Sequence, residues 1–410
     1  MPKTVSALVR EAVADAAIVD IHTHLFDPAM GSLLLSGIDE LLTYQYLVAE
    51  VLRARPDIAP DAFYALARPA QADLVWEELF LRRSPVSEAC RGVVTVLDAL
   101  GVSPRAKDLR RARAYFARRP VAARVDRAFE LAGLSRVYMT NDLLDPAEAP
   151  LWSKGFRRDP RFLGVLRLDR AVMNWPEPVA ALRAAGADVD ESLSGRTLAG
   201  VRDVLDRGCD RLDARYVAIS LPPSFAYPDP LSPLTNLMTH AVIPMAERRG
   251  LPLALMIGVR KLANPALRLA GDSVGAAPVE TVEALARDFP RARFAVTYLS
   301  RENQHAFCIA ARKFANLLPF GCWWFLNNPT FIREMTSMRL ETLGLSFIPQ
   351  HSDARVLEQV IYKWRHSREI IGDVLASKYE DLARAGWRAT AAEIRRDVTA
   401  LLGGSLLERR

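Results

Sequence analysis

The sequence predicts an α/β fold, namely a (β/α)₈ TIM barrel with a helical insertion after its first strand. Eight short apolar or β-branched runs alternate with helical segments, which is the pattern of parallel strands covered by helices. A long region of helical periodicity separates the first run from the second. A doubly wound open sheet is the alternative, but no glycine-rich phosphate-binding loop follows the first run.

The predicted elements follow one another in the order that a barrel requires. The N-terminal segment MPKTVSALVREAVADAAIVD is predicted to form an amphipathic helix that leads into the first strand. Several of the runs are continuously hydrophobic, as expected of strands that are buried on both faces. The eight strands are predicted at Ile18 to His22, Val137 to Thr140, Phe162 to Leu168, Tyr216 to Leu221, Leu253 to Ile257, Phe294 to Tyr298, Leu317 to Cys322 and Phe347 to Pro349.

The region between the first two strands has no convincing strand of its own. Residues 36–130 show helical periodicity, as in IDELLTYQYLVAEVLR. In a barrel, the loop after a strand lies on the carboxyl-terminal face, where active sites are found, so this insertion is predicted to roof the site. A second helical excursion, Pro176 to Leu212, follows the third strand. We predict one compact unit, in which residues 1–35 and 131–410 form the barrel and residues 36–130 form the insertion.

The composition excludes several classes of protein. The net charge of +6 comes from 54 basic and 48 acidic residues that are spread over amphipathic helices, so no nucleic-acid partner is expected. No apolar run is long enough to cross a membrane, and the N-terminus lacks the apolar core of a signal peptide. We expect a cytoplasmic protein without a membrane partner, and homo-oligomerisation stays open. The four cysteines lie far apart and form no C-x-x-C motif, as is typical of proteins from a reducing compartment. They are Cys90, Cys209, Cys308 and Cys322.

The stretch AIVDIHTHL, residues 17–25, is the most informative part of the chain. Alternate side chains of a strand point to the same side, so His22 and His24 would converge at the end of the first strand. Two imidazoles at this spacing can bind one metal ion, and the chain has only six histidines. The alternative is a chance pair of surface histidines, because H-x-H alone is a weak motif. We predict a metal site at His22 and His24.

Further motifs follow this stretch along the chain. They are YQYLVAEVLR at 44–53, MTNDLLD at 139–145, RLDRAVMNW at 167–175, LALMIGVRKLANPALRLAGDSVG at 253–275, FGCWWF at 320–325 and SDAR at 352–355. Together with DIHTHL at 20–25, and in this order, they resemble the motifs of the uronate (glucuronate) isomerase family, a branch of the amidohydrolase superfamily. The resemblance covers nearly the whole chain.

Three departures from the family pattern identify the chain as a divergent member. Met256 stands at the position of the histidine that the family has in its fifth strand. Tyr44 and Gln45 replace the Asp-His pair that precedes the family's tyrosine, here Tyr46. Leu143 replaces a proline.

The resemblance implies that Asp353 completes the metal site with His22 and His24. Two imidazoles and one carboxylate leave coordination positions open for water or substrate, which is typical of a catalytic site. Zinc is the expected divalent metal, because nitrogen and oxygen ligands suit it. The alternative role of Asp353 is to cap the helix that is predicted to begin at Ala354.

The resemblance also implies that Arg355 and Arg167 bind the carboxylate and hydroxyls of a sugar acid. A guanidinium offers paired donors that match the two oxygens of a carboxylate. The alternative for both arginines is a surface salt bridge. Arg301 has a weaker claim to the substrate, and the neighbouring pair Trp323 and Trp324 is predicted to wall the pocket, unless it belongs to the core.

Two further residues are candidates for proton handling. Tyr46 can donate or relay a proton near the sugar oxygens, or it can serve only to anchor the inserted helix. His351 lies two residues before Asp353 and would point to the same side of an extended segment, where it can partly replace the histidine that is absent at Met256. The alternative for His351 is a loop histidine behind the ligands.

These observations together favour a metal-dependent aldose–ketose isomerase that acts on a uronate or a related small acidic sugar. Asp353 or a metal-bound hydroxide would take the proton from C2, with Tyr46 assisting. A hydrolase of the same superfamily, acting on a lactone, amide or amine, is the first alternative, because the loss of histidine at Met256 makes a changed chemistry credible. A catalytically silent sugar-acid-binding protein is the second, and the retention of His22, His24, Asp353 and Arg355 argues against it.

Overall fold

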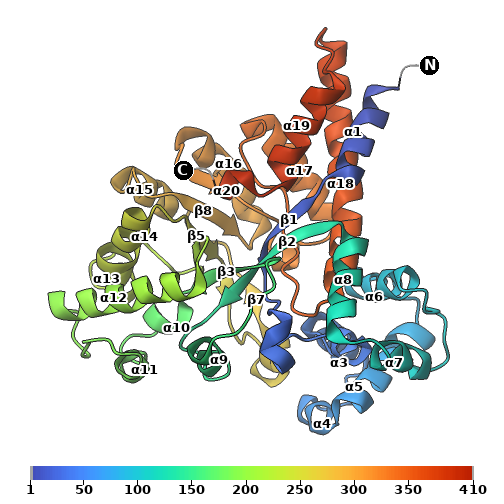
Figure 1. Cartoon of the computed structure of the whole chain (residues 1–410), viewed down its shortest axis with the longest axis horizontal. Helices are drawn as coiled ribbons and strands as arrows, with labels where there is room; N and C mark the ends of the chain where they lie inside the picture. Colours follow the sequence, from blue (N-terminus) through green and yellow to red (C-terminus); the bar gives the residue numbers. More distant parts are fainter. Residues whose placement is uncertain (1–2, 409–410) are drawn as a thin grey trace.

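A parallel sheet lies at the centre of the molecule. The computed structural model describes residues 3–408. Within them, one seven-stranded parallel sheet has the order β1-β2-β3-β4-β5-β8-β9, and helices surround it (Figure 1). The α/β prediction is therefore confirmed. The strands are β1 (Ile18–Thr23), β2 (Leu134–Asn141), β3 (Phe162–Arg167), β4 (Val217–Leu221), β5 (Leu253–Ile257), β8 (Phe294–Tyr298) and β9 (Leu317–Pro319).

The eighth predicted strand differs from the other seven. The run Phe347 to Pro349 forms only one parallel bridge, between Ile348 and Phe320 beyond β9. Farther along, the N–H of His24 in the loop after β1 donates to the carbonyl of Ala354 at 2.8 Å. The segment thus joins both edges of the curled sheet, and the ring of strands closes as a barrel. It cannot extend as a regular strand, because Pro349 has no N–H to donate.

Side chains of the strands alternate between the inside of the barrel and the surrounding helices. Tyr216, just before β4, and Ala218 belong to an interior hydrophobic cluster, whereas Val217 and Ile219 pack in the outer core. This alternation buries both faces of each strand, which explains the continuous hydrophobic runs of the sequence. Leu407 of the C-terminal helix α20 (Ser405–Glu408) also joins the interior cluster.

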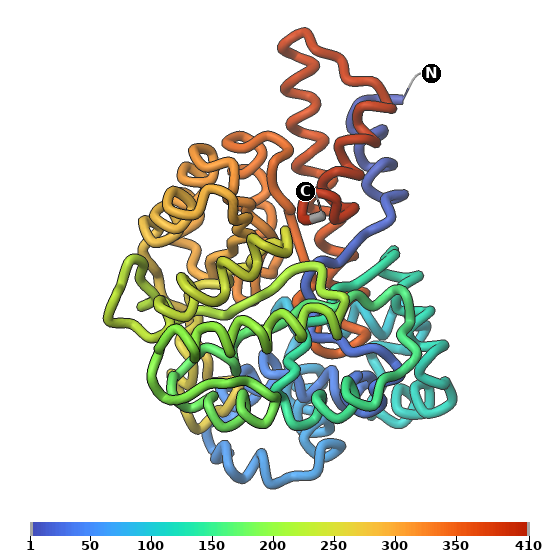
Figure 2. The backbone as a smooth tube through the Cα atoms, turned by 60° about the vertical axis from the view of Figure 1, so that its left-hand side comes forward, coloured from blue at the N-terminus to red at the C-terminus, as the bar shows by residue number. Residues whose placement is uncertain are grey.

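Helices cover the outside of the sheet, and three of them project beyond it. Figures 1 and 2 show α1, α18 and α19 side by side, and α1 contacts both of the others. No helix within residues 3–408 combines the length and apolar character needed to span a membrane. The helices of the barrel layer and the projection are α1 (Val5–Asp15), α8 (Val121–Ala132), α9 (Ala149–Lys154), α10 (Asp169–Val172), α11 (Val179–Ala184), α12 (Gly195–Leu212), α13 (Pro233–Leu237), α14 (Ile243–Arg249), α15 (Glu280–Asp288), α16 (Gln304–Lys313), α17 (Pro329–Leu343), α18 (Gln359–Arg384) and α19 (Ala391–Leu402).

The chain between β1 and β2 is helical and has a hydrophobic cluster of its own. This second cluster runs from Ile38 to Phe116 and is distinct from the main core, to which Val125 and Phe129 of α8 belong. Figure 1 shows the helices of the cluster beside one end of the barrel. They are α2 (Ile38–Leu42), α3 (Gln45–Ala54), α4 (Pro60–Ala65), α5 (Arg68–Trp76), η2 (Glu77–Leu81), α6 (Glu88–Ala99) and α7 (Arg110–Ala117).

A short hairpin after β5 reaches from the barrel to these helices. Its strands β6 (Val259–Arg260) and β7 (Ser273–Val274) are antiparallel, and the loop between them contains η4 (Pro265–Gly271). The hydroxyl of Tyr64 in α4 donates to the carbonyl of Leu267 at 2.6 Å. The hairpin thereby connects the insertion to the carboxyl end of β5.

Candidate metal and substrate site

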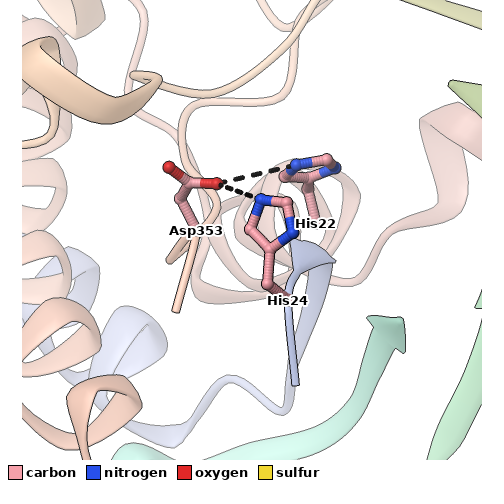
Figure 3. Close-up of side chains that lie close together, drawn as sticks. All are labelled: His22, His24 and Asp353. Carbon is pink, nitrogen blue, oxygen red and sulfur yellow. Dashed lines mark ion pairs between the residues drawn. The ribbon is translucent and has the colours of Figure 1, made fainter. Parts of the chain in front are cut away.

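Three side chains meet where the first strand lies beside residues 347–354, the segment that closes the barrel. His22 lies near the end of β1, His24 is the first residue after this strand, and Asp353 belongs to the closing segment. Oδ1 of Asp353 lies 3.6 Å from Nε2 of His22 and 3.3 Å from Nε2 of His24. Figure 3 shows all three groups pointing toward one another, and their ligand atoms lie within 4.8 Å of each other.

The backbone of Asp353 is shaped for this meeting. Its φ of 54° lies in the left-handed region, which L-residues rarely adopt, and its N–H donates to the carbonyl of His22 at 3.1 Å. Asp20, two residues before His22 on β1, accepts from the N–H of Ser352 at 3.0 Å and from Nε1 of Trp364 at 2.8 Å. Burial raises the pKa of Asp20 to about 6. These bonds fix the loop that carries Asp353 onto β1.

Two hydroxyl groups set the tautomers of the histidines. The hydroxyl of Tyr216 donates to the carbonyl of Ile21, so its oxygen accepts from Nδ1 of His22, 3.1 Å away. Thr140 likewise donates to the carbonyl of Thr23, and its oxygen lies 3.0 Å from Nδ1 of His24. Each ring therefore carries its proton on Nδ1 and presents the lone pair of Nε2.

The electrostatics of the three groups suit a cation. Burial lowers the pKa of both His22 and His24 well below the usual value, so the imidazoles are neutral. Nε2 of His22 and Oδ1 of Asp353 are buried and have no hydrogen-bond partner among residues 3–408. Orphaned lone pairs that face one another are costly without a ligand, and a divalent cation would satisfy them all. The donor set therefore fits a metal.

A cavity of about 200 Å³ opens beside this group. Arg355, Trp323 and Trp324 line it, and Met256 forms part of its wall. The indole N–H of Trp324 is buried and has no partner among the described residues, so it can donate to an oxygen of a ligand. A wider pocket of about 720 Å³ adjoins the cavity and shares Arg355 and other residues with it.

The predicted arginines have different surroundings. Arg167 lines the cavity, but its Nε and Nη2 both donate to the carboxylate of Asp169, at 3.1 Å each. Arg355 has no ion pair within residues 3–408. Arg301 lies outside the cavity, where its Nε donates to Glu334 at 3.1 Å and 57 % of its side chain is exposed. Thus the structure brings Arg355 and Arg167, but not Arg301, to the cavity.

The two candidates for proton handling are not among the residues that line the cavity. Tyr46 does not line the cavity; its ring stacks on Phe325 with 6.2 Å between ring centres, and burial raises the pKa of its phenol well above the usual value. The ring of His351 lies 5.1 Å from that of His22 and packs on Gly321, where an added Cβ would lie only 1.9 Å from the imidazole. Neither ring nitrogen of His351 has a hydrogen-bond partner among the described residues, and burial lowers its pKa to about 4.

Several residues that contact the predicted ligands or line the cavity were not predicted from the sequence. Tyr216 and Thr140 come from other strands, and no local pattern connects them with the histidines. Asp20 has a local signal, because it lies on the same strand face as His22 two residues earlier. Asp169 follows Arg167 at the same spacing and is the first residue of α10. Lys261 also lines the cavity, from the hairpin after β5.

Fold and site together define a class of protein: a closed parallel α/β barrel with a candidate mononuclear metal site where its strands end. Comparison with models of protein families gave no match, and neither did comparison with curated protein sequences. Comparison with solved structures found similarities that extend over nearly the whole chain, among them the following three.

A uronate isomerase from Bacillus halodurans C-125 has 47% sequence identity and a TM-score of 0.97, over 100% of this chain and 98% of that one. A uronate isomerase from Thermotoga maritima has 14% identity and a TM-score of 0.78, over 98% and 97% of the chains. A glucuronate isomerase from Caulobacter crescentus has 15% identity and a TM-score of 0.78, over 99% and 94%. The last two show the fold alone. Because the chain is 47% identical over its full length to the Bacillus halodurans protein, it belongs to the uronate isomerase family. This confirms the predicted resemblance.

Proposed function

We propose that the protein is a metal-dependent aldose–ketose isomerase that acts on a uronate. One observation carries the proposal: two neutral imidazoles and a carboxylate meet beside a cavity of about 200 Å³ that also holds the unpaired guanidinium of Arg355. This arrangement occurs in a chain that is 47% identical over its full length to a uronate isomerase. Cation-binding groups at one end and a carboxylate receptor at the other fit an open-chain sugar acid.

His22, His24 and Asp353 would hold the metal, which we expect to be zinc. When bound, a divalent cation supplies positive charge beside the oxygens on which negative charge develops during the reaction. Arg355 would bind the substrate carboxylate through two parallel hydrogen bonds and fix the distance from the carboxylate to C1 and C2.

The reaction moves hydrogen within the substrate. A base takes the proton from C2 and leaves its electron pair to form the enediol; a proton returns to C1, and the hydroxyl hydrogen of O2 passes to O1. No external oxidant or reductant is needed. We assign the base to Asp353 and the assisting donor to Tyr46, whose phenol burial keeps protonated. His351, neutral and in contact with the ring of His22, is the second candidate for proton handling.

We further propose that the helical insertion roofs the site. A pocket of about 310 Å³ lies between the insertion and the barrel, and Tyr44 and Gln45 line it together with Arg355. The same guanidinium therefore borders both the inserted helix α3 and the inner cavity. Closure over a reacting sugar acid would exclude water from the enediol.

A hydrolase of the amidohydrolase superfamily is the second candidate function. The observation that favours it is Met256, which is 2 % exposed and lines the cavity where the family has a histidine. A thioether cannot shuttle a proton as an imidazole does. The same metal ligands would serve either reaction, so an activity measurement must separate the two.

The test combines metal content with a screen of substrates. We expect about one divalent metal per chain and conversion of D-glucuronate or D-galacturonate to the corresponding keto acid. In D₂O, deuterium at the carbon that receives the proton is expected, because a proton held by a base can exchange with solvent. The variant that combines His22→Ala and His24→Ala should fold but lose both metal and activity. Turnover of lactones or amides, with no keto acid from any uronate, would replace the isomerase by the hydrolase.

A further inference from the structure

A pocket that the proposed function does not use lies at the amino-terminal ends of the strands. It has a volume of about 1040 Å³, and its lining includes Pro252, Arg293 and Asn316, which directly precede β5, β8 and β9. These strands run parallel to β1, whose carboxyl end carries His22, so the pocket and the metal ligands lie at opposite ends of the barrel. Figure 1 shows α15, α16 and α20 in the upper half of the view and the inserted helices α4, α5 and α7 in the lower half.

Positive charge dominates the lining of this pocket, which we call the basic pocket. Five of its lining residues are cationic and none is acidic. The hydroxyls of Thr342 and Ser346 add neutral hydrogen-bond donors. Cations that line one cavity repel one another unless an anion lies between them. The five are Arg287, Arg291, Arg293, Arg312 and Lys313.

The basic pair at the end of α16 has no carboxylate partner. Arg312 and Lys313 occupy the last turn of this helix, where cations complement the partial negative charge of a helix end. At the same end of the barrel, α14 ends with the pair Arg248 and Arg249, and both of these form ion pairs with Asp206. The side chains of Arg312 and Lys313 have no ion pair or hydrogen bond among the described residues. A helix end carries about half a negative charge, so two full cations exceed what it neutralises.

Arg293 is a half-buried cation without a counter-ion. Its Nη2 donates to the carbonyls of Leu406 at 3.4 Å and Leu407 at 2.9 Å, and no carboxylate pairs with it in the described part of the chain. Burial lowers the pKa of this guanidinium, and an anion nearby would offset that effect. Because Leu407 packs in the barrel interior, an anion at Arg293 would also stabilise the attachment of the C-terminal helix.

The two arginines between α15 and β8 have weak partners. Arg287 pairs with its neighbour Asp288 at 3.3 Å, and Arg291 approaches Glu247 only to 3.9 Å, with 88% of its own side chain exposed. Exposed pairs of this kind contribute little. The backbone beside them is fixed, because Asn316 donates to two carbonyls at the carboxyl end of α15, at 3.1 Å each. The basic pocket therefore presents several largely uncompensated cations on a fixed frame.

We propose that the basic pocket binds a small phosphate ester that carries two phosphate groups. A phosphate monoester has a charge of about −1.5 to −2 at neutral pH and three acceptor oxygens, so two of them nearly balance the five cations. Guanidinium groups match these oxygens with paired donors. The volume is ample for a molecule of this size. None of the lining residues lines the inner cavity, so the inference goes beyond the proposed function.

Titration calorimetry of the metal-loaded protein with D-fructose 1,6-bisphosphate tests the proposal. We expect about one molecule to bind per chain. Arg312→Gln combined with Lys313→Gln should lower the affinity at least about tenfold, as the loss of charge-assisted hydrogen bonds requires. The matched control combines Arg118→Gln with Arg388→Gln, two exposed cations that form no ion pair among the described residues, and should change the affinity less than about twofold.

Two further titrations separate the basic pocket from other binding sites. The variant that combines His22→Ala and His24→Ala should bind the bisphosphate as the wild type does, whereas loss of binding there would place the ligand at the metal and overturn the proposal. D-Fructose 6-phosphate should bind at least about tenfold more weakly, because it lacks one phosphate group. Equal affinities for the two sugars would reject a bisphosphate as the ligand. Equal affinities of the Arg312 and Lys313 variant and its control, or no saturable binding to the wild type, would overturn the site.

Discussion

At the scale of single residues, two hydroxyl groups decide which nitrogen each histidine can offer to a metal. Tyr216 and Thr140 each donate to a backbone carbonyl and so can only accept from the ring beside them. The Nε2 lone pairs of His22 and His24 are therefore preorganised toward Asp353. Partners of this kind hold the tautomer and orientation of metal-binding histidines.

Tyr216→Phe should weaken metal binding while it preserves the fold. Phenylalanine keeps the ring in the barrel interior but leaves Nδ1 of His22 without its acceptor, and loss of such a partner lowers metal affinity by roughly 10- to 100-fold. Competition with a chromogenic zinc chelator measures the effect. Tyr298→Phe is the matched control, because Tyr298 is another buried strand tyrosine whose hydroxyl donates to Pro278, away from the metal ligands. Equal zinc affinities in the two variants would contradict the role of Tyr216.

The residues of the site differ in how far sequence can predict them. His22 and His24 follow from strand alternation, which is local. The pairing of Arg167 with Asp169 depends on how the chain turns from β3 into α10, so spacing alone does not distinguish Arg167 from an unpaired arginine. Lys261 lines the cavity from the turn after β6, and the conformation of that turn does not follow from sequence spacing. Whether Tyr46 and Arg301 take part in the reaction stays a prediction.

At the scale of elements, burial on both faces made the strands predictable. The bounds of β5 and β8 agree with the predicted runs Leu253 to Ile257 and Phe294 to Tyr298, because a continuous apolar run has clear ends. The run at Phe347 is apolar as well, yet it forms a single bridge. The apolar composition of this run correctly indicates that it is buried. Its backbone hydrogen bonding, however, is limited by Pro349 and by the turn that brings Asp353 to β1.

The long helix α12, within the second excursion, offers a test of close packing. A Cβ at Gly200 of α12 would overlap the carbonyl oxygen of Asp188, whereas one at Gly195, the first residue of the same helix, meets nothing within 4 Å. Gly195→Ala should therefore stabilise the protein by up to about 1 kcal/mol, as alanine does in helices. Gly200→Ala should destabilise it by about 1–3 kcal/mol, because the loop must move. Urea unfolding gives both values, and stabilisation by both variants would contradict the close approach.

At the scale of the whole molecule, hydrogen bonds and an ion pair join the hydrophobic cluster of the insertion to the main core. Glu358, at the start of α18, accepts from Ser36 at 2.6 Å and from the N–H of Gly37 at 3.0 Å, just before α2. Lys363 of α18 pairs with Glu88 of α6 at 2.6 Å and donates to the carbonyl of Asn327 at 3.0 Å. These ties fix the inserted helices to the barrel close to Tyr46, whose ring centre is 5.9 Å from the Lys363 ammonium.

Removal of only one partner of the ion pair between Lys363 and Glu88 should destabilise the protein strongly. The two side chains are 6% and 17% exposed, so removal of one partner leaves the other charge poorly solvated. We expect Lys363→Met to lower the free energy of unfolding by about 3 kcal/mol, and the addition of Glu88→Gln to recover most of that loss. Urea unfolding of the metal-loaded variants, completed as a double-mutant cycle, measures the coupling.

An exposed ion pair provides the control for this cycle. Arg127 and Glu130 of α8 pair at 2.7 Å with side chains 43% and 69% exposed, so Arg127→Met should cost less than about 0.5 kcal/mol. Because the buried tie lies between the two clusters, its loss should also expose the inserted helices to protease before the barrel unfolds. If Lys363→Met costs no more than Arg127→Met, the tie does not hold the insertion, and the packing of α3 and α6 on the barrel must do so alone.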